Sequence, residues 1–277
     1  MDKAIYRTYA QMFKGFNLKV TSDSLENTLP NIKHFNSIES SKVQKNIKEI
    51  SNYLKNGVLD GSKIKSDWFP DGNFDIFLSH SHADKDLALL IANILRVKFD
   101  LNVFIDSEVW GFADDLLREI DDKYALAPSK QTYEYQVRNR TTSNVHLMLN
   151  SALNEIIDKS ECLIFLNTKK SVYTDKNLYD EKTYTASPWI MSELYFSSRV
   201  RRRFPDRYKQ NMTFNESLRK SASSNEQAFV MLHDLPVSHL EPLTENNLIN
   251  WLQQEDTTDP LGYLYSDVLD LNYILKD

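Results

Sequence analysis

Phe74-Asp75-Ile76-Phe77-Leu78-Ser79-His80 is an apolar run of strand length that ends in polar residues, and it is the clearest indication of the fold class. A short, almost continuous apolar run predicts a strand that is buried on both faces. Residues 84–99 follow directly, with apolar side chains at the spacing of an amphipathic helix. A buried strand that leads straight into such a helix is the opening unit of an α/β fold.

The same alternation of strand and helix continues along the chain. Further strands are predicted at residues 103–105, 162–166 and 229–232, and further helices at residues 147–158, from Ser187 onward and at residues 248–254. This order predicts an α/β fold of flavodoxin-like type, an open parallel sheet with helices on both faces. Two polar segments, residues 119–143 and 204–226, interrupt the order and are expected to be insertions at the sheet edge or lids over the site.

The first part of the chain, residues 1–72, is predicted to be a small α-helical N-terminal region and linker that precedes the domain at residues 73–277. Two apolar stripes at helical spacing support this prediction. They are Tyr6, Tyr9, Phe13 and Phe16 within residues 5–16, and Val43, Ile47, Ile50 and Leu54. Turn signals indicate that residues 57–72 form the linker. The stripes pack either on the rest of the chain or on a second subunit, and both readings stay open.

Composition excludes several classes of protein. Of the 277 residues, 41% are hydrophobic and 26% are charged, which supports a packed core and argues against disorder. The formal charge of -6 gives no general reason to expect nucleic acid as a partner. No apolar run approaches the roughly 20 residues of a membrane span. The N-terminus lacks the basic start of a secretion signal, so a cytoplasmic location without membrane attachment is expected. The single cysteine, Cys162, is expected to be a buried strand residue rather than a catalytic thiol.

Polar residues follow the first and third predicted strands where those strands end. In an open parallel sheet, ligands bind beyond the carboxyl ends of the strands, at the point where the strand order reverses. In a flavodoxin-like order, that point lies between the first strand, which ends in Ser79-His80-Ser81-His82, and the third, which ends in Asn167-Thr168. Glu193 lies in the second turn of the helix from Ser187 and can face the same crevice. Trp189, four residues earlier, is on the same helical face.

Three segments, in this order, resemble the successive motifs of Toll/interleukin-1 receptor (TIR) domains. They are the 74–80 segment, the Val103-Phe104-Ile105-Asp106 strand with the Trp110-Gly111 loop after it, and Ser187-Pro188-Trp189 followed by Glu193-Leu194. The resemblance covers about residues 74–255. Bacterial TIR domains of this kind, such as the Thoeris-like proteins of antiphage defence, cleave the nicotinamide–ribose bond of NAD+. The resemblance therefore implies an NAD+ nucleosidase or ADP-ribosyl cyclase in which Glu193 is the essential residue.

The chemistry of that reaction is consistent with the assignment. Loss of nicotinamide leaves an oxocarbenium-like ribose, so the protein must hold the ribose hydroxyls and place negative charge near the developing cation. One carboxylate suffices, because nicotinamide is a good leaving group that needs no general acid. NAD+ is then the substrate, and neither a metal nor a cofactor is expected. A helix N-terminus favours the ionised form of a nearby carboxylate, which suits Glu193 for this role.

The polar residues after the first strand have two interpretations. Ser79, His80, Ser81 and His82 are predicted to contact ribose or phosphate, whereas Ser81 can instead cap the helix that follows. A metal at His80 and His82 is disfavoured, since no cysteine or carboxylate cluster completes a ligand set.

Three further groups have alternatives of the same kind. Asp106, Trp110 and Phe112 occupy the loop that gates the nucleotide site and mediates assembly in TIR domains, or they form a solvated surface. Trp189 either walls the site or packs beneath it. Arginines within residues 199–207 either grip a phosphate or an acidic partner, or form a solvated helix end favoured by the macrodipole.

These observations favour one function and leave a rival. The favoured function is an NAD+-consuming TIR enzyme of antiviral defence that makes ADP-ribose or a cyclic ADP-ribose signal. Its expected partners are further copies of the chain, bound through TIR–TIR self-association, and an effector protein that reads the product. The rival is a TIR scaffold or adaptor that acts by assembly alone. A phosphoryl-acceptor relay domain is disfavoured, because it needs an aspartate at the end of the third strand, where Asn167 stands.

Overall fold

The computed structural model describes residues 12–21, 23, 25, 49–69, 72–129, 131–173, 183–203, 205, 231–255 and 258–269. The chain divides into two compact units. The first comprises Met1–Ser40, Asn73–Ile105 and Ile157–Asp277, and the second comprises Ser41–Gly72 and Asp106–Ile156. None of the helices in the described residues is both long enough and apolar enough to cross a membrane.

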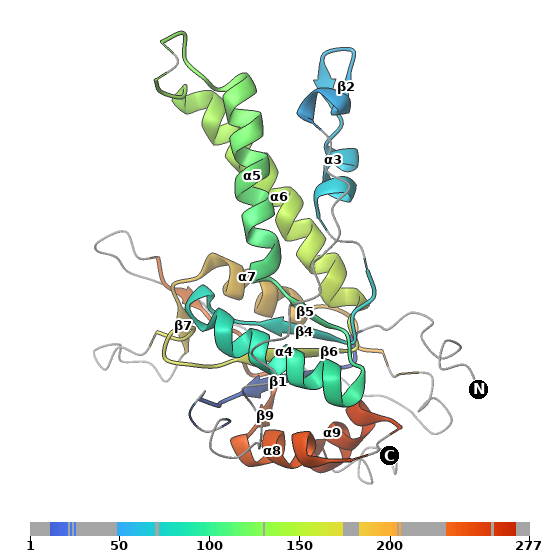
Figure 1. The fold of residues 1–277 in the computed structure, drawn as a ribbon. Helices are drawn as coiled ribbons and strands as arrows, with labels where there is room; N and C mark the ends of the chain where they lie inside the picture. Colours follow the sequence, from blue (N-terminus) through green and yellow to red (C-terminus); the bar gives the residue numbers. More distant parts are fainter. Residues whose placement is uncertain are drawn as a thin grey trace, which may run out of the picture. The chain divides into compact units, whose positions relative to one another are not determined.

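The first unit is built on a five-stranded sheet in which all neighbours are parallel (Figure 1). In spatial order the strands are β5 (Val103–Ile105), β4 (Ile76–Ser79), β6 (Cys162–Leu166), β1 (Lys14–Leu18) and β9 (Glu241–Leu243). The prediction of an α/β fold with a parallel sheet is confirmed, and the order is compatible with a flavodoxin-like arrangement. The first predicted strand, β4, lies between the second, β5, and the third, β6, as expected for that arrangement.

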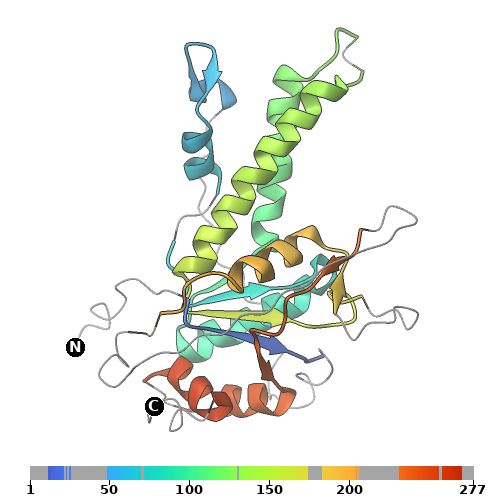
Figure 2. The same ribbon diagram turned by 180° about the vertical axis from the view of Figure 1, so that it is seen from behind.

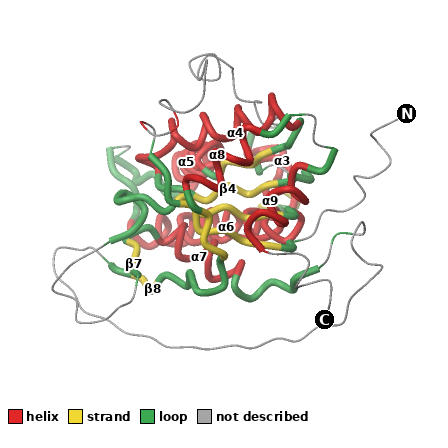
Figure 3. Tube along the Cα trace, turned by 90° about the horizontal axis from the view of Figure 1, so that it is seen from below, coloured by secondary structure: helices red, strands yellow, loops and turns green. Residues whose placement is uncertain are grey.

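Helices cover both faces of this sheet. α4 (Lys85–Phe99), α8 (Glu245–Gln253) and α9 (Pro260–Leu269) share one apolar cluster with Ile76, Leu78 and Ile164. Because successive strand residues point to opposite faces, Phe77 and Ser79 face the other side. α7 (Pro188–Ser197) lies on the side of the sheet opposite α4 (Figure 3).

The predicted helix at residues 5–16 is wrong where the structure describes it. Residues 5–11 lie outside the described part, but Lys14–Leu18 is strand β1, inserted between β6 and β9 (Figure 2). Phe16 and Leu18 are fully buried on the α4 side, and the ring of Phe16 stacks on Tyr265 at a centroid distance of 6.1 Å. A short apolar run fits the periodicity of a helix or of a strand. Here, pairing with two strands that are distant in sequence selects the extended form.

The predicted strand at residues 229–232 is also wrong in its described half. Residues 229 and 230 lie outside the described part, and Met231 and Leu232 belong to no strand. The residues that follow form β8 (His233–Asp234), which pairs antiparallel with β7 (Tyr184–Thr185) in a separate ribbon. The position beside β6 that this strand would have taken is filled by β1.

The second unit combines short elements from the N-terminal part of the chain with two long helices. Its first elements are η2 (Ile50–Tyr53), β2 (Leu54–Lys55), β3 (Val58–Leu59) and α3 (Gly61–Trp68). The predicted helix through Leu54 and the predicted linker at residues 57–72 are therefore wrong, while Val43 and Ile47 lie outside the described residues. Asp60 caps α3 by accepting a hydrogen bond from the backbone N–H of Lys63 at 3.1 Å.

The two long helices are α5 (Ser107–Tyr124) and α6 (Tyr135–Lys159), and α6 ends within the first unit. The segment at residues 119–143, predicted as an insertion or lid, is thus mostly helical. The predicted helix at residues 147–158 is confirmed as the second half of α6. An ion pair of 3.3 Å between Arg138 and Asp121 joins the two helices near their connection. The other predicted insertion, residues 204–226, lies outside the described residues apart from residue 205.

The position of β1 inside the sheet generates a stability prediction. Replacing Phe16 by Ala should reduce the free energy of unfolding by about 3–5 kcal/mol, because it empties a fully buried aromatic site. Val97→Ala is the matched control: Val97 is exposed on α4, and its loss should change stability by less than about 0.5 kcal/mol. Urea unfolding followed by circular dichroism measures both. Equal midpoints for the two variants would place Phe16 outside the core.

Candidate functional site

The carboxyl ends of β4 and β6 are adjacent, because the two strands are parallel neighbours. Ser79, the last residue of β4, is paired with Phe165, one residue before the end of β6. The next helices after these strands, α4 and α7, lie on opposite faces of the sheet (Figure 3). Ligands of open parallel sheets bind at such a point. The predicted adjacency of the first and third strands is therefore confirmed.

Glu193 meets the end of β4 at this edge. The hydroxyl of Ser79 donates a hydrogen bond to Oε2 of Glu193 at 2.6 Å, across 114 residues of sequence. Both side chains are buried, with Glu193 only 1% exposed. Hydrogen bonds from a hydroxyl to a carboxylate are short and strong, so this contact holds α7 and β4 in a defined register.

The start of α7 sets the position of Glu193. Ser187 caps the helix by accepting from the backbone N–H of Ile190 at 3.3 Å, and Pro188 occupies the first helical position. Glu193 is then the sixth helical residue. The helix macrodipole acts mainly within the first turn, so its expected influence on Glu193 is small. The hydroxyl of Ser79 is a direct polar contact of this carboxylate.

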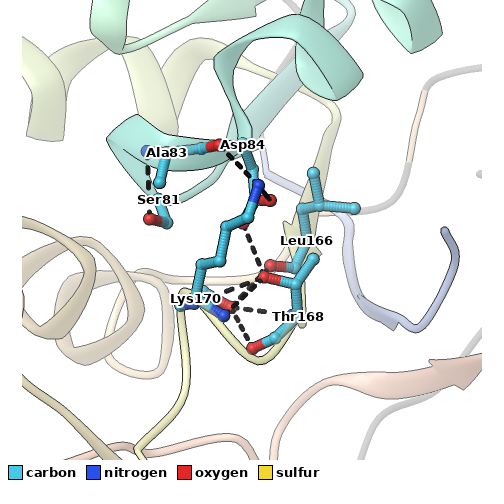
Figure 4. Close-up of polar contacts among 7 residues, drawn as sticks. Ser81, Ala83, Asp84, Leu166, Thr168 and Lys170 are labelled. Atoms are coloured by element: carbon cyan, nitrogen blue, oxygen red, sulfur yellow. Dashed lines mark hydrogen bonds and ion pairs between the residues drawn. The ribbon is translucent and has the colours of Figure 1, made fainter. Parts of the chain in front are cut away.

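A second cluster at the same edge joins the loops that follow β4 and β6 (Figure 4). Asp84 accepts from the hydroxyl of Thr168 at 2.5 Å and forms an ion pair of 3.3 Å with Lys170. Lys170 also donates to the carbonyl oxygen of Ala83 at 2.8 Å. None of these residues was predicted from the sequence as a site residue, and Thr168 was named only as the end of the third strand.

The polar residues after β4 have different environments. His80 is fully buried, and its Nδ1 lies 3.3 Å from the carbonyl oxygen of Leu78. Ser81 accepts from the backbone N–H of Ala83 at 3.2 Å and caps the short helix η3 (His82–Asp84), so the capping interpretation is the one that the structure supports. His82 is exposed. Within the described residues, no three His, Cys, Asp or Glu side chains form a group that could hold a metal ion.

The remaining predicted site residues belong to helices. Trp189 lies in the first turn of α7 and is half-buried. Asp106, Trp110 and Phe112 belong to the second unit, where Asp106 caps α5 by accepting from the backbone N–H of Ser107 at 2.8 Å. The predicted Trp110-Gly111 loop is wrong, since both residues are helical. Of the predicted site residues, the structure brings Ser79 and Glu193 into direct contact.

Two expectations about isolated residues have clear outcomes. Cys162 is buried at the start of β6, and its burial, with the negative charge of Glu161 nearby, raises the pKa of the thiol well above its usual value. The prediction of a buried strand cysteine is confirmed. Of the arginines after α7, Arg201 and Arg203 are exposed, while Arg199 lies over the ring of Tyr195 at 5.2 Å.

Arg202 differs from its neighbours, because its side chain turns inward. Its Nη2 donates to the carbonyl oxygen of Ser197 at 3.0 Å, and the hydroxyl of Ser197 lies 2.8 Å from Nε2 of His239. Burial, together with the positive charge of Arg202, lowers the pKa of His239 to about 4. His239 is therefore neutral near pH 7. Nothing in the sequence pattern marked this residue, because the contact joins segments 42 residues apart.

No family model, no curated protein and no solved structure matches this chain. The function therefore has to be inferred from the fold and from the residues at the carboxyl edge.

The low pKa of His239 predicts a specific pH dependence of stability. The pKa of His239 is about 6.5 in the unfolded state and about 4 in the folded state. As the pH falls, the unfolded state therefore binds a proton at a higher pH than the folded state does. The contribution of His239 to stability is thus complete above about pH 6.5 and is lost as the pH falls toward 4. When the pH falls from about 7.5 to about 5, the free energy of unfolding of the wild-type protein should decrease by about 1 to 2 kcal/mol more than that of His239→Gln. Urea unfolding at the two pH values measures both changes. Parallel curves for the two proteins would contradict this prediction.

The contact between Ser79 and Glu193 predicts a second stability effect. Ser79→Ala removes the donor from a buried carboxylate and should cost about 1.5–3 kcal/mol of unfolding free energy. Ser198→Ala is the control, because Ser198 bonds only a carbonyl oxygen at the exposed end of α7 and should cost less than about 0.5 kcal/mol. Chemical denaturation of both variants gives the comparison. A Ser79→Ala protein as stable as the control would mean that the hydrogen bond contributes little.

Proposed function

We propose that the protein is a TIR-domain enzyme of antiviral defence that cleaves the nicotinamide–ribose bond of NAD+. The single observation that supports this function best is the buried contact of Glu193 with Ser79 at the carboxyl edge between β4 and β6. It places a carboxylate beside the edge at which an open parallel sheet takes a nucleotide. The motif resemblance to bacterial TIR domains supplies the reaction, and the parallel sheet is compatible with their fold.

In the proposed reaction, the bond between C1′ of the ribose and the nicotinamide nitrogen breaks, and its electron pair leaves with nicotinamide. The positive charge passes to the ribose ring as an oxocarbenium-like centre. Glu193 stabilises this charge and accepts hydrogen bonds from ribose hydroxyls, which take the place that the Ser79 hydroxyl holds in the free protein. Water at C1′ then gives ADP-ribose and a proton, whereas a nucleophile on the nucleotide itself gives a cyclic product.

The burial of Glu193 supports this role in one respect. A carboxylate that is removed from bulk water interacts more strongly with a nearby cation than an exposed one does. The cost of removing it from water is reduced by the hydrogen bond from Ser79. A fixed negative charge that needs no reorganisation during the reaction is the usual means by which enzymes stabilise a cationic transition state.

The same burial also favours a second function. A glutamate that is 1% exposed and hydrogen-bonded to the sheet is also consistent with a purely structural role, in which it holds α7 on β4. A TIR scaffold or adaptor that acts by self-association would need no more than this. The two functions differ in one measurable respect. A scaffold leaves NAD+ intact at any protein concentration and with any partner, whereas the enzyme releases nicotinamide.

The test compares Glu193→Gln with the wild-type protein in an NAD+ assay. The variant keeps the shape and an acceptor for Ser79 but loses the charge, so nicotinamide release should fall by at least about 100-fold. Glu255→Gln, at an exposed position, is the matched control and should react like wild type. Mass spectrometry of the products separates ADP-ribose from cyclic ADP-ribose. Undiminished release by Glu193→Gln would rule out the proposed role, and no release by wild type would favour the scaffold.

A further inference from the structure

Lys170 is a cation held in a fixed position at the carboxyl edge. Its ammonium group donates to the carbonyl oxygen of Ala83 at 2.8 Å and pairs with Oδ1 of Asp84 at 3.3 Å (Figure 4). An ammonium has three donor hydrogens, so these two contacts leave one for a further acceptor. The Lys170 side chain is 57% exposed, whereas that of Asp84 is only 4% exposed. The positive end of the pair therefore faces solvent and the negative end is covered.

The loop that carries Lys170 is held by several hydrogen bonds. The hydroxyl oxygen of Thr168 accepts from the backbone N–H groups of Lys170 at 3.0 Å and Ser171 at 3.3 Å, while its proton goes to Asp84. The hydroxyl of Ser171 in turn donates to the carbonyl oxygen of Leu166, the last residue of β6. A lysine whose backbone and head group are both held loses less conformational freedom on binding a ligand than a mobile one does.

Charged groups close in sequence reinforce the positive character of this surface. Lys169 is exposed and Lys85 is half-buried, against one exposed carboxylate at Asp86. The carboxylate of Asp84 has both oxygens engaged, one by Thr168 and one by Lys170. It therefore anchors the lysine rather than presenting negative charge to a ligand.

We infer that Lys170 binds the diphosphate of a dinucleotide substrate, an inference that rests on the proposed cleavage of NAD+. The two anchors are five residues apart in the chain: Ser79, at the end of β4, contacts Glu193, and Asp84, in η3, contacts Lys170. Glu193, on α7, and Lys170, on the loop after β6, thus both contact the segment from Ser79 to Asp84. Glu193 acts on the ribose that loses nicotinamide, and Lys170 holds the phosphates that link this ribose to the second nucleoside.

Direct binding of ADP and of adenosine, measured by isothermal titration calorimetry, tests the inference without any reaction. ADP carries the diphosphate and adenosine lacks it. Lys170→Gln should weaken ADP binding about tenfold and leave adenosine binding unchanged, because one charge-assisted hydrogen bond is lost. Lys169→Gln, the neighbouring exposed lysine, is the matched control and should bind ADP within about twofold of wild type.

Lys170→Gln also leaves the buried carboxylate of Asp84 without its cation, which can disturb the fold. The double variant Asp84→Asn with Lys170→Gln removes both charges and keeps an acceptor for Thr168. It should show the same tenfold loss for ADP. Wild-type affinity for ADP in the double variant, or no preference of the wild-type protein for ADP over adenosine, would overturn the inference.

Kinetics on NAD+ then separate this inference from the proposed function. Lys170→Gln should raise KM about tenfold with kcat within about threefold of wild type, because phosphate contacts act equally in the ground state and in the transition state. If wild type releases nicotinamide and the variant has an unchanged KM, the role of Lys170 fails while the enzyme stands. If wild type releases none, the proposed reaction fails, and the ADP measurement still decides whether Lys170 binds a diphosphate.

Discussion

β6 is hydrogen-bonded to β4 on one side and to β1 on the other, and this central pairing determines both the helix layers and the position of the site contacts. All five residues of β6 are fully buried. A parallel strand with no exposed face needs a layer of helices on each side, which α4, α8 and α9 provide on one face and α7 on the other. Parallel pairing also brings the ends of β4 and β6 together. The site contacts follow from that pairing, since each of them joins residues near those two strand ends to α7 or to each other.

Much of this arrangement follows from local sequence signals. β4, β5 and β6 are near-continuous apolar runs, so their strand character is clear without any knowledge of their neighbours. The start of α7 follows from Ser187 as cap and Pro188 as first helical residue. The rule that ligands bind where parallel strands reverse order then places Glu193 near Ser79, although the two residues are 114 positions apart.

Other features depend on partners that no local pattern reveals. β1 is five residues long with aromatic and polar residues mixed, and its extended form is selected by pairing of Phe16 with Ile164 on one side and Glu241 on the other. The polar segment at residues 119–143 has the composition of a loop, yet most of it belongs to α5 and α6, because a polar helix pair needs only a narrow apolar face. The pair of Asp84 and Lys170 uses two common residue types with no characteristic spacing.

In the proposed cleavage of NAD+, the two groups at the carboxyl edge would act on different parts of the substrate. The charge of the ribose increases from the ground state to the transition state. A buried carboxylate beside it therefore stabilises the transition state more than the ground state and lowers the barrier. The charge of the diphosphate does not change, so a lysine that contacts it stabilises both states equally and affects only capture of the substrate. The burial of each group agrees with this division. Glu193 is buried, so its charge acts strongly over a short range, whereas the Lys170 side chain is 57% exposed and is accessible to a solvated anion.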